Sequence, residues 1–547
     1  MYTIAKKIVA AVGLLCVAGF AGAQSSSFRF AKSIDVFFAV LQELDMYYVD
    51  SIDYDHTIMG AIDDMLATLD PYTIFISEEE VNDFDISTTG QYGGIGALIR
   101  KRGDYAEFVE IYQGFPADRH GVKVGDRLLA VDSVLITSNN VTDVSALLKG
   151  KMDTKVVMKV LKLQTQDTLS LSVARAQIQL PSVPYYGLLE GKVGYIYFAT
   201  FTKNCSEDVK HAINELKSKG ATSLILDLRS NAGGLMDEAV EVANLFLPKG
   251  QEVLSVRGRA GDEVKYKTKR SAVDADIPLV VMANSMSASS SEIVAGALQD
   301  LDRAVVVGQR SYGKGLVQSV RPLPFNEKLK LTTAKYYIPS GRCVQIMDYT
   351  HRNPDGSVGK VPDSLVRKFT TRAGRTVYDG GGITPDEVIA PQPTPQVLQR
   401  LYEKFLFFDF ANRFFIDNDT LTTPSRFKLQ DTVYRQFIAF IEKSGFTYET
   451  ASQQALRSLV EATQREQCYD SIQPDLRALS EKLTPDLARD LVRFKDDILA
   501  VLGEEIVSRY YYQTGRIEFS VAGDKEVGRA RDILLDATLY KSFLQKK

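Results

Sequence analysis

Short apolar runs alternate with helical stretches through the middle of the chain. Four runs have the length of fully buried parallel strands: 192–198, 223–229, 279–283 and 304–308. Helical spacing follows the first three, at 206–218, from Met236 onward and at 291–298. This alternation predicts a βα core with a mainly parallel sheet over residues 176–393. Within it, 329–338 alternates as a further strand, and the polar, basic stretch 347–378 predicts a surface loop.

The flanking regions follow other patterns. Apolar positions of residues 28–85 repeat at helical spacing, which predicts an N-terminal helical segment over 24–87. One helix carries the apolar stripe from Ile34 to Leu44, and a second spans 57–68. Residues 88–175 open with a glycine-rich turn and continue as short strands. Residues 394–547 predict a helical domain, with helices at 395–416, 429–444, 449–468 and 484–511. Thr484 is the expected N-cap of the last helix, ahead of Pro485.

Composition narrows the class of protein. Charged residues make up 24% and hydrophobic residues 45% of the 547 residues, as in soluble globular proteins. The net charge of −4 argues against a nucleic-acid-binding protein. Cys205, Cys343 and Cys468 are an odd, widely spaced set that predicts neither a disulfide framework nor a metal site. No cofactor is expected, because the chain has no ligand spacing or phosphate-binding loop.

The first 23 residues predict an export signal. A basic start at Lys6-Lys7 precedes the apolar stretch 8–19 and the small-residue site Ala21-Gly22-Ala23. Cleavage after Ala23 would release the chain outside the cytoplasm, in a bacterial periplasm. A lipoprotein anchored at Cys16 is disfavoured, because Leu15 stands where such signals carry a small residue. We expect no membrane span in the mature chain.

Ser289 stands at the start of the helix after the strand 279–283, and two interpretations fit it. Ser289-x-x-Glu292 is a capping box, which would give the serine a structural role. Alternatively, free N–H groups at a helix N-terminus could stabilise an oxyanion beside a nucleophilic serine. The flanked lysine Gly313-Lys314-Gly315 favours the nucleophile, since Ser–Lys pairs are known catalytic variants. Such a lysine needs burial to lower its pKa from about 10.4, and Gln318 could orient its ammonium.

A histidine-based triad is the disfavoured alternative. The chain has only four histidines, and we assign each to a surface or core position: His56, His120, His211 and His351. No G-x-S-x-G nucleophile elbow is present. The sequence therefore favours a serine–lysine site.

The motif S-A-S-x-S-E-I, followed by G-K-G-x-V-Q, resembles the C-terminal processing peptidases, also called tail-specific proteases. The resemblance implies that Ser289 is the nucleophile, Lys314 the general base and Gln318 the support of the lysine. Ser290 stands where the family usually has alanine. Four serines lie among the five residues 287–291, so the spacing of the motif selects Ser289.

A second motif carries the same resemblance. Residues 227–234 read D-L-R-S-N-A-G-G, close to the family's D-L-R-x-N-P-G-G. The resemblance implies that the N–H groups of Gly233 and Ser290 form the oxyanion hole. Ala232 replaces the family's proline, which relaxes the turn but leaves the N–H donor.

Residues 92–132 resemble a PDZ domain of the bacterial protease type. The glycine turn at 92–99 is followed by G-F-P-A-D at 114–118 and G-D-R-L-L-A-V-D at 125–132. Such a turn can offer backbone N–H groups to a terminal carboxylate, and a strand edge can accept the peptide. The expected peptide-binding residues are Gly93, Gly94, Ile95 and Gly96. A helix at 141–149 would form the other wall.

These observations predict a multidomain α/β protein: signal 1–23, N-terminal helices 24–87, a β-barrel-like PDZ domain 88–175, a βα protease core 176–393 with its serine at a helix N-terminus, and C-terminal helices 394–547. The implied function is an exported serine endopeptidase that acts on polypeptides with accessible C-termini through an acyl-enzyme. The resemblance also implies a homo-oligomer and allows a regulatory protein partner. A PDZ scaffold or chaperone with an inactive protease domain, and a serine esterase or amidase, are the alternatives.

Overall fold

The computed structural model of this chain describes residues 27–137 and 141–546. The predicted export signal, 1–23, lies outside the described residues. The chain divides into two compact units, one ending at Phe75 and the other beginning at Ile76.

The first unit is helical, as the apolar spacing predicts. Residues 27–47 form one helix, and α2 spans Tyr54–Ala67, where Asp53 caps the helix by accepting from the His56 N–H. Large apolar side chains along the helix at 27–47 are exposed, including Phe28, Phe30 and Phe38 at 69%, 71% and 62%. A soluble chain rarely exposes so continuous an apolar face.

The second unit begins with α3 (Val81–Thr89) and a β domain. Its main sheet has the order β3-β4-β5-β7-β8, and the small strand β6 pairs with β5. The strands are β3 Ala97–Arg102, β4 Tyr105–Ile111, β5 Arg127–Val131, β6 Val134–Leu135, β7 Lys155–Leu161 and β8 Thr168–Ala174. A separate pair joins β2 (Gln91–Gly94) to β9 (Ala176–Gln179), and the helices are α4 (Pro116–Arg119) and α5 (Val141–Leu148). In β7, buried and exposed residues alternate, as in a strand with one face on a core.

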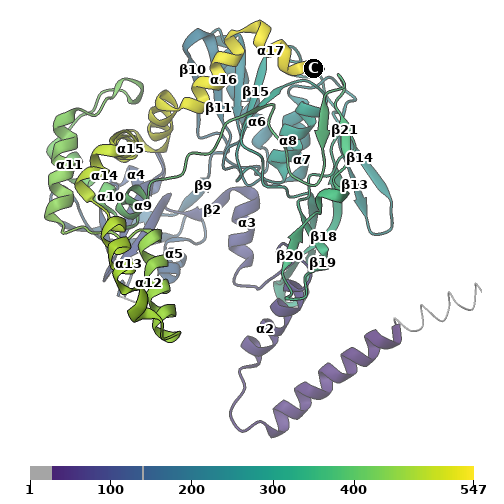
Figure 1. Ribbon diagram of the computed structural model, residues 1–547, viewed down its shortest axis with the longest axis horizontal. Helices are drawn as coiled ribbons and strands as arrows, with labels where there is room; N and C mark the ends of the chain where they lie inside the picture. The colour runs from purple at the N-terminus through teal and green to yellow at the C-terminus, as the bar shows by residue number, and fades with distance from the viewer. Residues whose placement is uncertain (1–26, 138–140, 547) are drawn as a thin grey trace, which may run out of the picture. The chain divides into compact units, whose positions relative to one another are not determined.

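The protease core is a six-stranded sheet of order β10-β11-β12-β15-β16-β23, parallel except for β10. Its strands are β10 Tyr185–Leu189, β11 Val193–Tyr197, β12 Ser223–Asp227, β15 Leu279–Ala283, β16 Val305–Gly308 and β23 Glu387–Val388. One face packs on α6 (Cys205–Ser218), α7 (Met236–Asn244) and α8 (Ser290–Asp300). The other face packs on α16 (Lys525–Leu535) and α17 (Ala537–Leu544), the last helices of the chain (Figure 1). Cover on both faces explains why the central strands are apolar throughout.

A second, antiparallel sheet lies beside this core and includes β13 (Glu252–Gly258), β14 (Glu263–Lys267), β17 (Leu316–Pro322) and β18 (Lys328–Tyr337). The strand β1 (Ile74–Ile76) ends at the boundary between the two units. Four short 3₁₀ turns, η1 to η4, span Glu190–Lys192, Pro324–Asn326, Asp363–Leu365 and Pro424–Arg426.

The prediction of a plain loop at 347–378 is wrong. This segment forms two small hairpins, β19 (Met347–Arg352) with β20 (Val358–Lys360) and β21 (Lys368–Thr370) with β22 (Thr376–Tyr378). Polar contacts anchor it: Arg375 Nε lies 2.6 Å from Asp302, and the buried Arg342 donates to the Tyr378 carbonyl at 3.2 Å. The strands are too short and polar for hydrophobic periodicity to reveal them.

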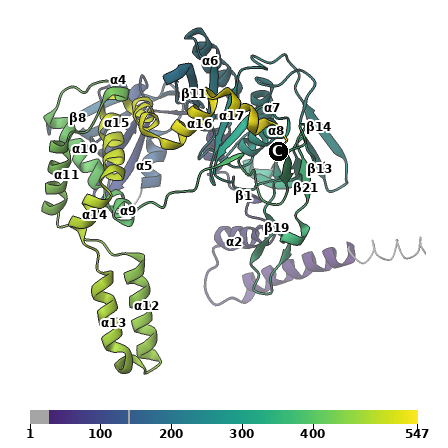
Figure 2. The same cartoon turned by 45° about the horizontal axis from the view of Figure 1, so that its top comes forward.

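The C-terminal region is helical, as predicted, but some helices begin and end at other residues than expected. The expected helix at 395–416 divides at Phe405, whose φ is 61°, into α9 (Gln396–Glu403) and α10 (Leu406–Asp417). Thr484 does not start a helix; it ends α13, and Asp486 caps α14 by accepting from the Arg489 N–H. The other helices are α11 Asp431–Lys443, α12 Ala451–Arg465, α13 Tyr469–Leu483, α14 Leu487–Arg493 and α15 Lys495–Gly523. In Figure 2, α12 and α13 project as an arm from the other helices.

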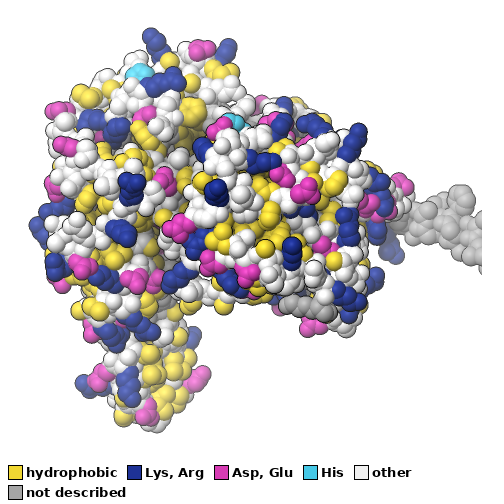
Figure 3. All heavy atoms as spheres, turned by 90° about the horizontal axis from the view of Figure 1, so that it is seen from above, with side chains coloured by type: hydrophobic (Ala, Val, Ile, Leu, Met, Phe, Trp, Pro, Cys, Tyr) yellow, Lys and Arg dark blue, Asp and Glu magenta, His cyan; other side chains and the backbone are white. Residues whose placement is uncertain are grey.

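The surface carries mixed charge. Over the face drawn in Figure 3, Lys and Arg side chains are interspersed with Asp and Glu. Among the described residues, no helix is both long enough and apolar enough to cross a membrane.

Candidate active site

Ser289 lies between β15 and α8, at the carboxyl edge of the parallel sheet. It is the residue before the first turn of α8, and its backbone has φ 55° and ψ −113°. A positive φ is strained for a residue with a side chain, and such strain is concentrated at functional sites. The buried strand β15 and the fully buried helix α8 hold it in this conformation.

The neighbouring serines have structural hydrogen bonds. Each of three hydroxyl groups donates to a backbone carbonyl: Ser287 to Leu228, Ser290 to Gly234 and Ser291 to Asn231, at 2.8, 3.0 and 2.8 Å. All three acceptors lie in the turn after β12. These bonds join the serine loop to the glycine turn and distinguish Ser289 from the other serines of the cluster.

Gly233 lies against the backbone of Ser289 and Ser290. Its φ is 96°, and a Cβ added there would lie 2.7 Å from the Ala288 oxygen and 2.9 Å from the Ser290 nitrogen. Only glycine fits this approach. The Gly233 N–H donates to Asn231 Oδ1 at 2.9 Å, so this amide has a partner within its own turn.

Glu292 connects the serine loop to the lysine loop. Its carboxylate is completely buried. One oxygen accepts from the N–H groups of Ser289 and Lys314, at 2.9 and 2.8 Å. The other accepts from the Ser311 hydroxyl and the Gly313 N–H, at 2.6 and 2.7 Å. The backbones of Ser289 and Lys314 therefore lie side by side on a shared acceptor.

Burial raises the pKa of the Glu292 carboxyl to about 7, although the four hydrogen bonds lower it. All four partners are donors, so the ionised carboxylate satisfies them best. The sequence marked Glu292 only as a capping partner of Ser289. The other three bonds come from residues 311–314, in the loop after β16. These residues are distant from Glu292 in sequence and come close to it only in the folded sheet.

Lys314 and Gln318 follow β16, the strand beside β15 in the parallel sheet. Lys314 is half-buried in the loop between β16 and β17, between Gly313 and Gly315. The Gly315 N–H donates to Gln345 Oε1 at 2.8 Å, which fixes the far side of the loop. Gln318 lies on β17, and its amide donates to the Thr332 hydroxyl on β18 at 3.1 Å.

Tyr336 also contacts this loop, and in the sequence it is marked only as one position of an alternating strand. It is 1% exposed, and its hydroxyl donates to the Lys314 carbonyl oxygen at 2.9 Å. Burial raises the pKa of Tyr336 well above 10, so the hydroxyl stays a donor.

The glycine turn of the β domain joins β2 to the edge strand β3. The Gly93 carbonyl accepts from the Gly150 N–H at 3.0 Å, just after α5. The carbonyls of Ile95 and Gly96 accept from Ala117 and Tyr112. A Cβ on Gly96, whose φ is 77°, would lie 2.4 Å from Phe115 Cβ. The turn is thus held close to α5 at one end of the edge strand.

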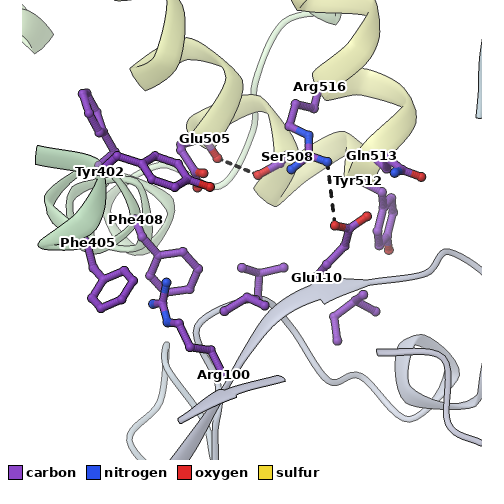
Figure 4. Close-up of a pocket in the computed structure, with 14 residues that line it drawn as sticks. Arg100, Glu110, Tyr402, Phe405, Phe408, Glu505, Ser508, Tyr512, Gln513 and Arg516 are labelled. Atoms are coloured by element: carbon purple, nitrogen blue, oxygen red, sulfur yellow. Dashed lines mark hydrogen bonds and ion pairs between the residues drawn. The ribbon is translucent and has the colours of Figure 1, made fainter. Parts of the chain in front are cut away.

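A separate cavity of about 350 Å³ lies between β3 and β4, α10 and α15 (Figure 4). On one side, the Arg100 guanidinium carbon lies 3.6 Å from the centre of the Phe405 ring. On the other, Arg516 lies 3.7 Å from Glu110, whose pKa is raised by burial. These contacts tie the β domain to the C-terminal helices.

Comparison with known proteins matches each of these regions. Residues 192–351 match peptidase family S41, residues 107–162 a PDZ domain, and residues 397–534 a domain described as "Probable PDZ-protease, C-terminal helical domain". A carboxy-terminal-processing protease of Bartonella bacilliformis is 33% identical over 342 residues, which cover 62% of this chain and 76% of the relative. A carboxyl-terminal-processing protease of Synechocystis is 36% identical over 316 residues, covering 56% and 70%.

Among solved structures, a photosystem II D1 C-terminal processing protease is 26% identical, covers 66% of this chain and 89% of that chain, and has a TM-score of 0.36. The sequence matches and the structure together confirm the predicted fold class: a PDZ domain, an S41 protease core, and helical regions at the N- and C-terminal sides. The chain belongs to peptidase family S41, with the carboxy-terminal-processing proteases, and is a serine-type peptidase.

Proposed function

We propose that this chain is an exported endopeptidase that recognises protein C-terminal tails and cleaves polypeptides with Ser289 as nucleophile and Lys314 as base. One observation carries the proposal. A single oxygen of the buried Glu292 accepts from both the Ser289 and the Lys314 N–H, so the two backbones lie together at the start of α8. A lysine held there can reach the serine from the adjacent loop.

In this mechanism the neutral Lys314 amine takes the proton of the Ser289 hydroxyl as its oxygen attacks the scissile carbonyl. Collapse of the tetrahedral intermediate breaks the C–N bond, and the lysine gives its proton to the leaving amine. Water then hydrolyses the acyl-enzyme through the same base. Gln318, at the start of β17, would orient the ammonium.

The oxyanion would bind to the N–H groups of Gly233 and Ser290. The close approach of Gly233 to the Ser290 nitrogen supports this role. The Gly233 N–H already donates to Asn231 Oδ1, so an oxyanion would share or displace that acceptor. Either way, binding of substrate would complete the hole.

The PDZ domain would bind the tail of the substrate. Strand β3 is the edge of its sheet, so an extended peptide could add to it by backbone hydrogen bonds. The terminal carboxylate would bind at the turn formed by Gly93, Gly94, Ile95 and Gly96, with α5 as the opposite wall. The neighbouring contact between α5 and β3 supports this groove.

Export and assembly are further parts of the proposal. The basic and apolar leader ending at Ala23 supports secretion to a periplasm. The exposed apolar face of the helix at 27–47 suits a second copy of the chain, which would make a homo-oligomer. A regulatory protein could use the projecting arm of α12 and α13, where Leu459 and Leu479 are 46% and 42% exposed.

The test is cleavage of an unstructured protein that ends in apolar residues, by wild type and by Ser289→Ala, with the fragments identified by mass. We expect fragments from the wild type alone, and fewer when the tail is made charged. Equal cleavage by both would reject Ser289 as the nucleophile. Tail binding without cleavage by either would instead favour a PDZ scaffold or chaperone.

A further inference from the structure

The Tyr336 side chain reaches the lysine loop from the neighbouring sheet. Its ring is 1% exposed and packs in the core that also contains α8. The hydroxyl donates to the Lys314 carbonyl at 2.9 Å, and the Ser289 carbonyl oxygen lies 3.4 Å from the same atom. The longer contact is at the limit of a hydrogen bond. The hydroxyl therefore binds mainly Lys314 and lies against the backbone of Ser289.

Glu292 and Tyr336 hold the two backbone groups of Lys314. Glu292 accepts from its N–H at 2.8 Å, and Tyr336 donates to its carbonyl at 2.9 Å. Since each peptide unit is planar, fixing both groups fixes the direction of the Cα–Cβ bond between them. The lysine side chain extends from that bond, so the point from which it extends is set before substrate binds. The Tyr336 N–H adds a third bond, to the Gly315 carbonyl at 3.0 Å.

Packing alone does not explain a tyrosine at this position. A phenylalanine would fill nearly the same volume, and a buried phenolic hydroxyl is costly unless it is hydrogen-bonded. This hydroxyl has the Lys314 carbonyl as its partner. Its presence couples β18 to the one loop that carries the lysine.

We propose that Tyr336 is a positioning residue of the peptidase site, whose hydroxyl holds Lys314 in register with Ser289. The proposal rests on the proposed roles of Ser289 and Lys314. Tyr336 acts through the lysine and does not itself touch the reacting atoms. Misplacing a reacting group by about 1 Å can cost about 10²-fold in rate, so one lost tie can have a large effect.

The test compares Tyr336→Phe with Tyr337→Phe in the full chain. Tyr337 is the next residue of β18 and half-buried, and its side chain points to the opposite face of the strand. The Arg257 guanidinium carbon lies 4.2 Å from its ring centre. We expect Tyr336→Phe to lower the single-turnover cleavage rate by about 10- to 100-fold, with KM within about twofold of wild type. Tyr337→Phe should keep both values within about twofold. The melting temperature of each variant is recorded alongside.

A structural role alone would lower the melting temperature of Tyr336→Phe and leave the single-turnover rate of the folded enzyme unchanged. That result, or a matching loss in Tyr337→Phe, would overturn the proposal. The Ser289→Ala variant distinguishes failure of the positioning role of Tyr336 from failure of the proposed function. If it abolishes cleavage while Tyr336→Phe is fully active, the dyad stands and the positioning role fails. If Ser289→Ala still cleaves, the proposed function itself fails.

Discussion

The serine site and the PDZ turn hold their backbone groups in different ways. At the serine site, buried side chains bind the backbone: Glu292 and Tyr336 hold the loops that carry Ser289 and Lys314. At the PDZ turn, the contacts come from other backbone groups, such as the Gly150 N–H on the Gly93 carbonyl, and β3 remains an edge strand. At the serine site, these bonds to the two loops are formed before any ligand binds. The PDZ turn has a strand edge that an added peptide could complete.

The difference follows from position in the sheet. β12, β15 and β16 are adjacent parallel strands, so the loops after them meet at one edge and can be tied together across it. β3 lies at the end of its sheet and has a neighbour on one side only. Chemistry requires positions fixed to a fraction of an ångström, whereas recognition of many tails requires adaptable backbone contacts.

Lys314→Met should have the largest effect. Removing the base should lower kcat at least about 10³-fold, while the affinity for an apolar tail, measured by fluorescence anisotropy, stays within about twofold of wild type. Lys335→Met is the matched control, because this exposed lysine lies on β18 near the same loop. If the Lys314→Met enzyme remained active, Lys314 would not be the base, and the fixed geometry of its loop would not serve catalysis.

Gly233→Ala should have the next largest effect on kcat. Its added Cβ would lie 2.7 Å from the Ala288 oxygen and displace the backbone next to Ser290, so we expect about a 10²- to 10³-fold loss of kcat. Gly220→Ala is the control, since Gly220 has a similar φ of 90° with nothing within 4 Å of an added Cβ. If both variants lose activity equally, backbone strain and not the close approach is responsible.

The sequence was sufficient to predict the central strands and the helix α8, because each depends on local spacing. The pairing of Ser289 with Lys314 stays a prediction, drawn from the flanked lysine and from the motif. Glu292 was visible only as a capping residue, since its partners at 311–314 are distant in sequence until β16 returns the chain. Tyr336 was one position of an alternating strand, and nothing local distinguishes it from Tyr337.

The failed predictions have equally physical causes. The segment 347–378 is ordered by ion pairs such as Arg375 with Asp302, which have no sequence periodicity. Thr484-Pro485 resembles a helix start, but α13 continues to Leu483 despite Pro474 in its interior, and the helical signal restarts only at Asp486. Short polar strands and helix breaks depend on tertiary contacts more than on propensity.

The Glu292→Gln variant tests how the buried Glu292 carboxyl makes the free energy of unfolding depend on pH. Burial raises the pKa of Glu292 to about 7, from 4.5. Between these values the folded state binds more protons than the unfolded state, so the free energy of unfolding falls as pH rises from 4.5 to 7. The expected fall is about 3 kcal/mol, and it should be absent from the Glu292→Gln variant, whose side-chain amide does not titrate.

Urea denaturation of both proteins across about pH 4.5–8 measures this difference. Burial raises the pKa of the nearby Tyr336 well above 10 and raises the pKa of Cys343 above its usual 9, so neither group titrates over this pH range. A parallel pair of stability curves would mean that Glu292 stays ionised throughout, with its four donors outweighing burial.

Gly96→Ala should have the smallest effect and should be confined to recognition. The new Cβ would lie 2.4 Å from Phe115 Cβ and displace the turn at the end of β3. We expect KM for an apolar-tailed protein to rise about 3- to 10-fold, with kcat for a short peptide that lacks such a tail unchanged. Gly103→Ala is the control, because Gly103 has φ 61° and open space around it at the far end of β3.

Since the PDZ turn lies in a separate sheet with its own core, a change there should not alter the hydrogen bonds that hold Lys314. A fall in kcat for the short peptide would mean that the two regions are coupled, and that tail binding helps to set the geometry of the serine site.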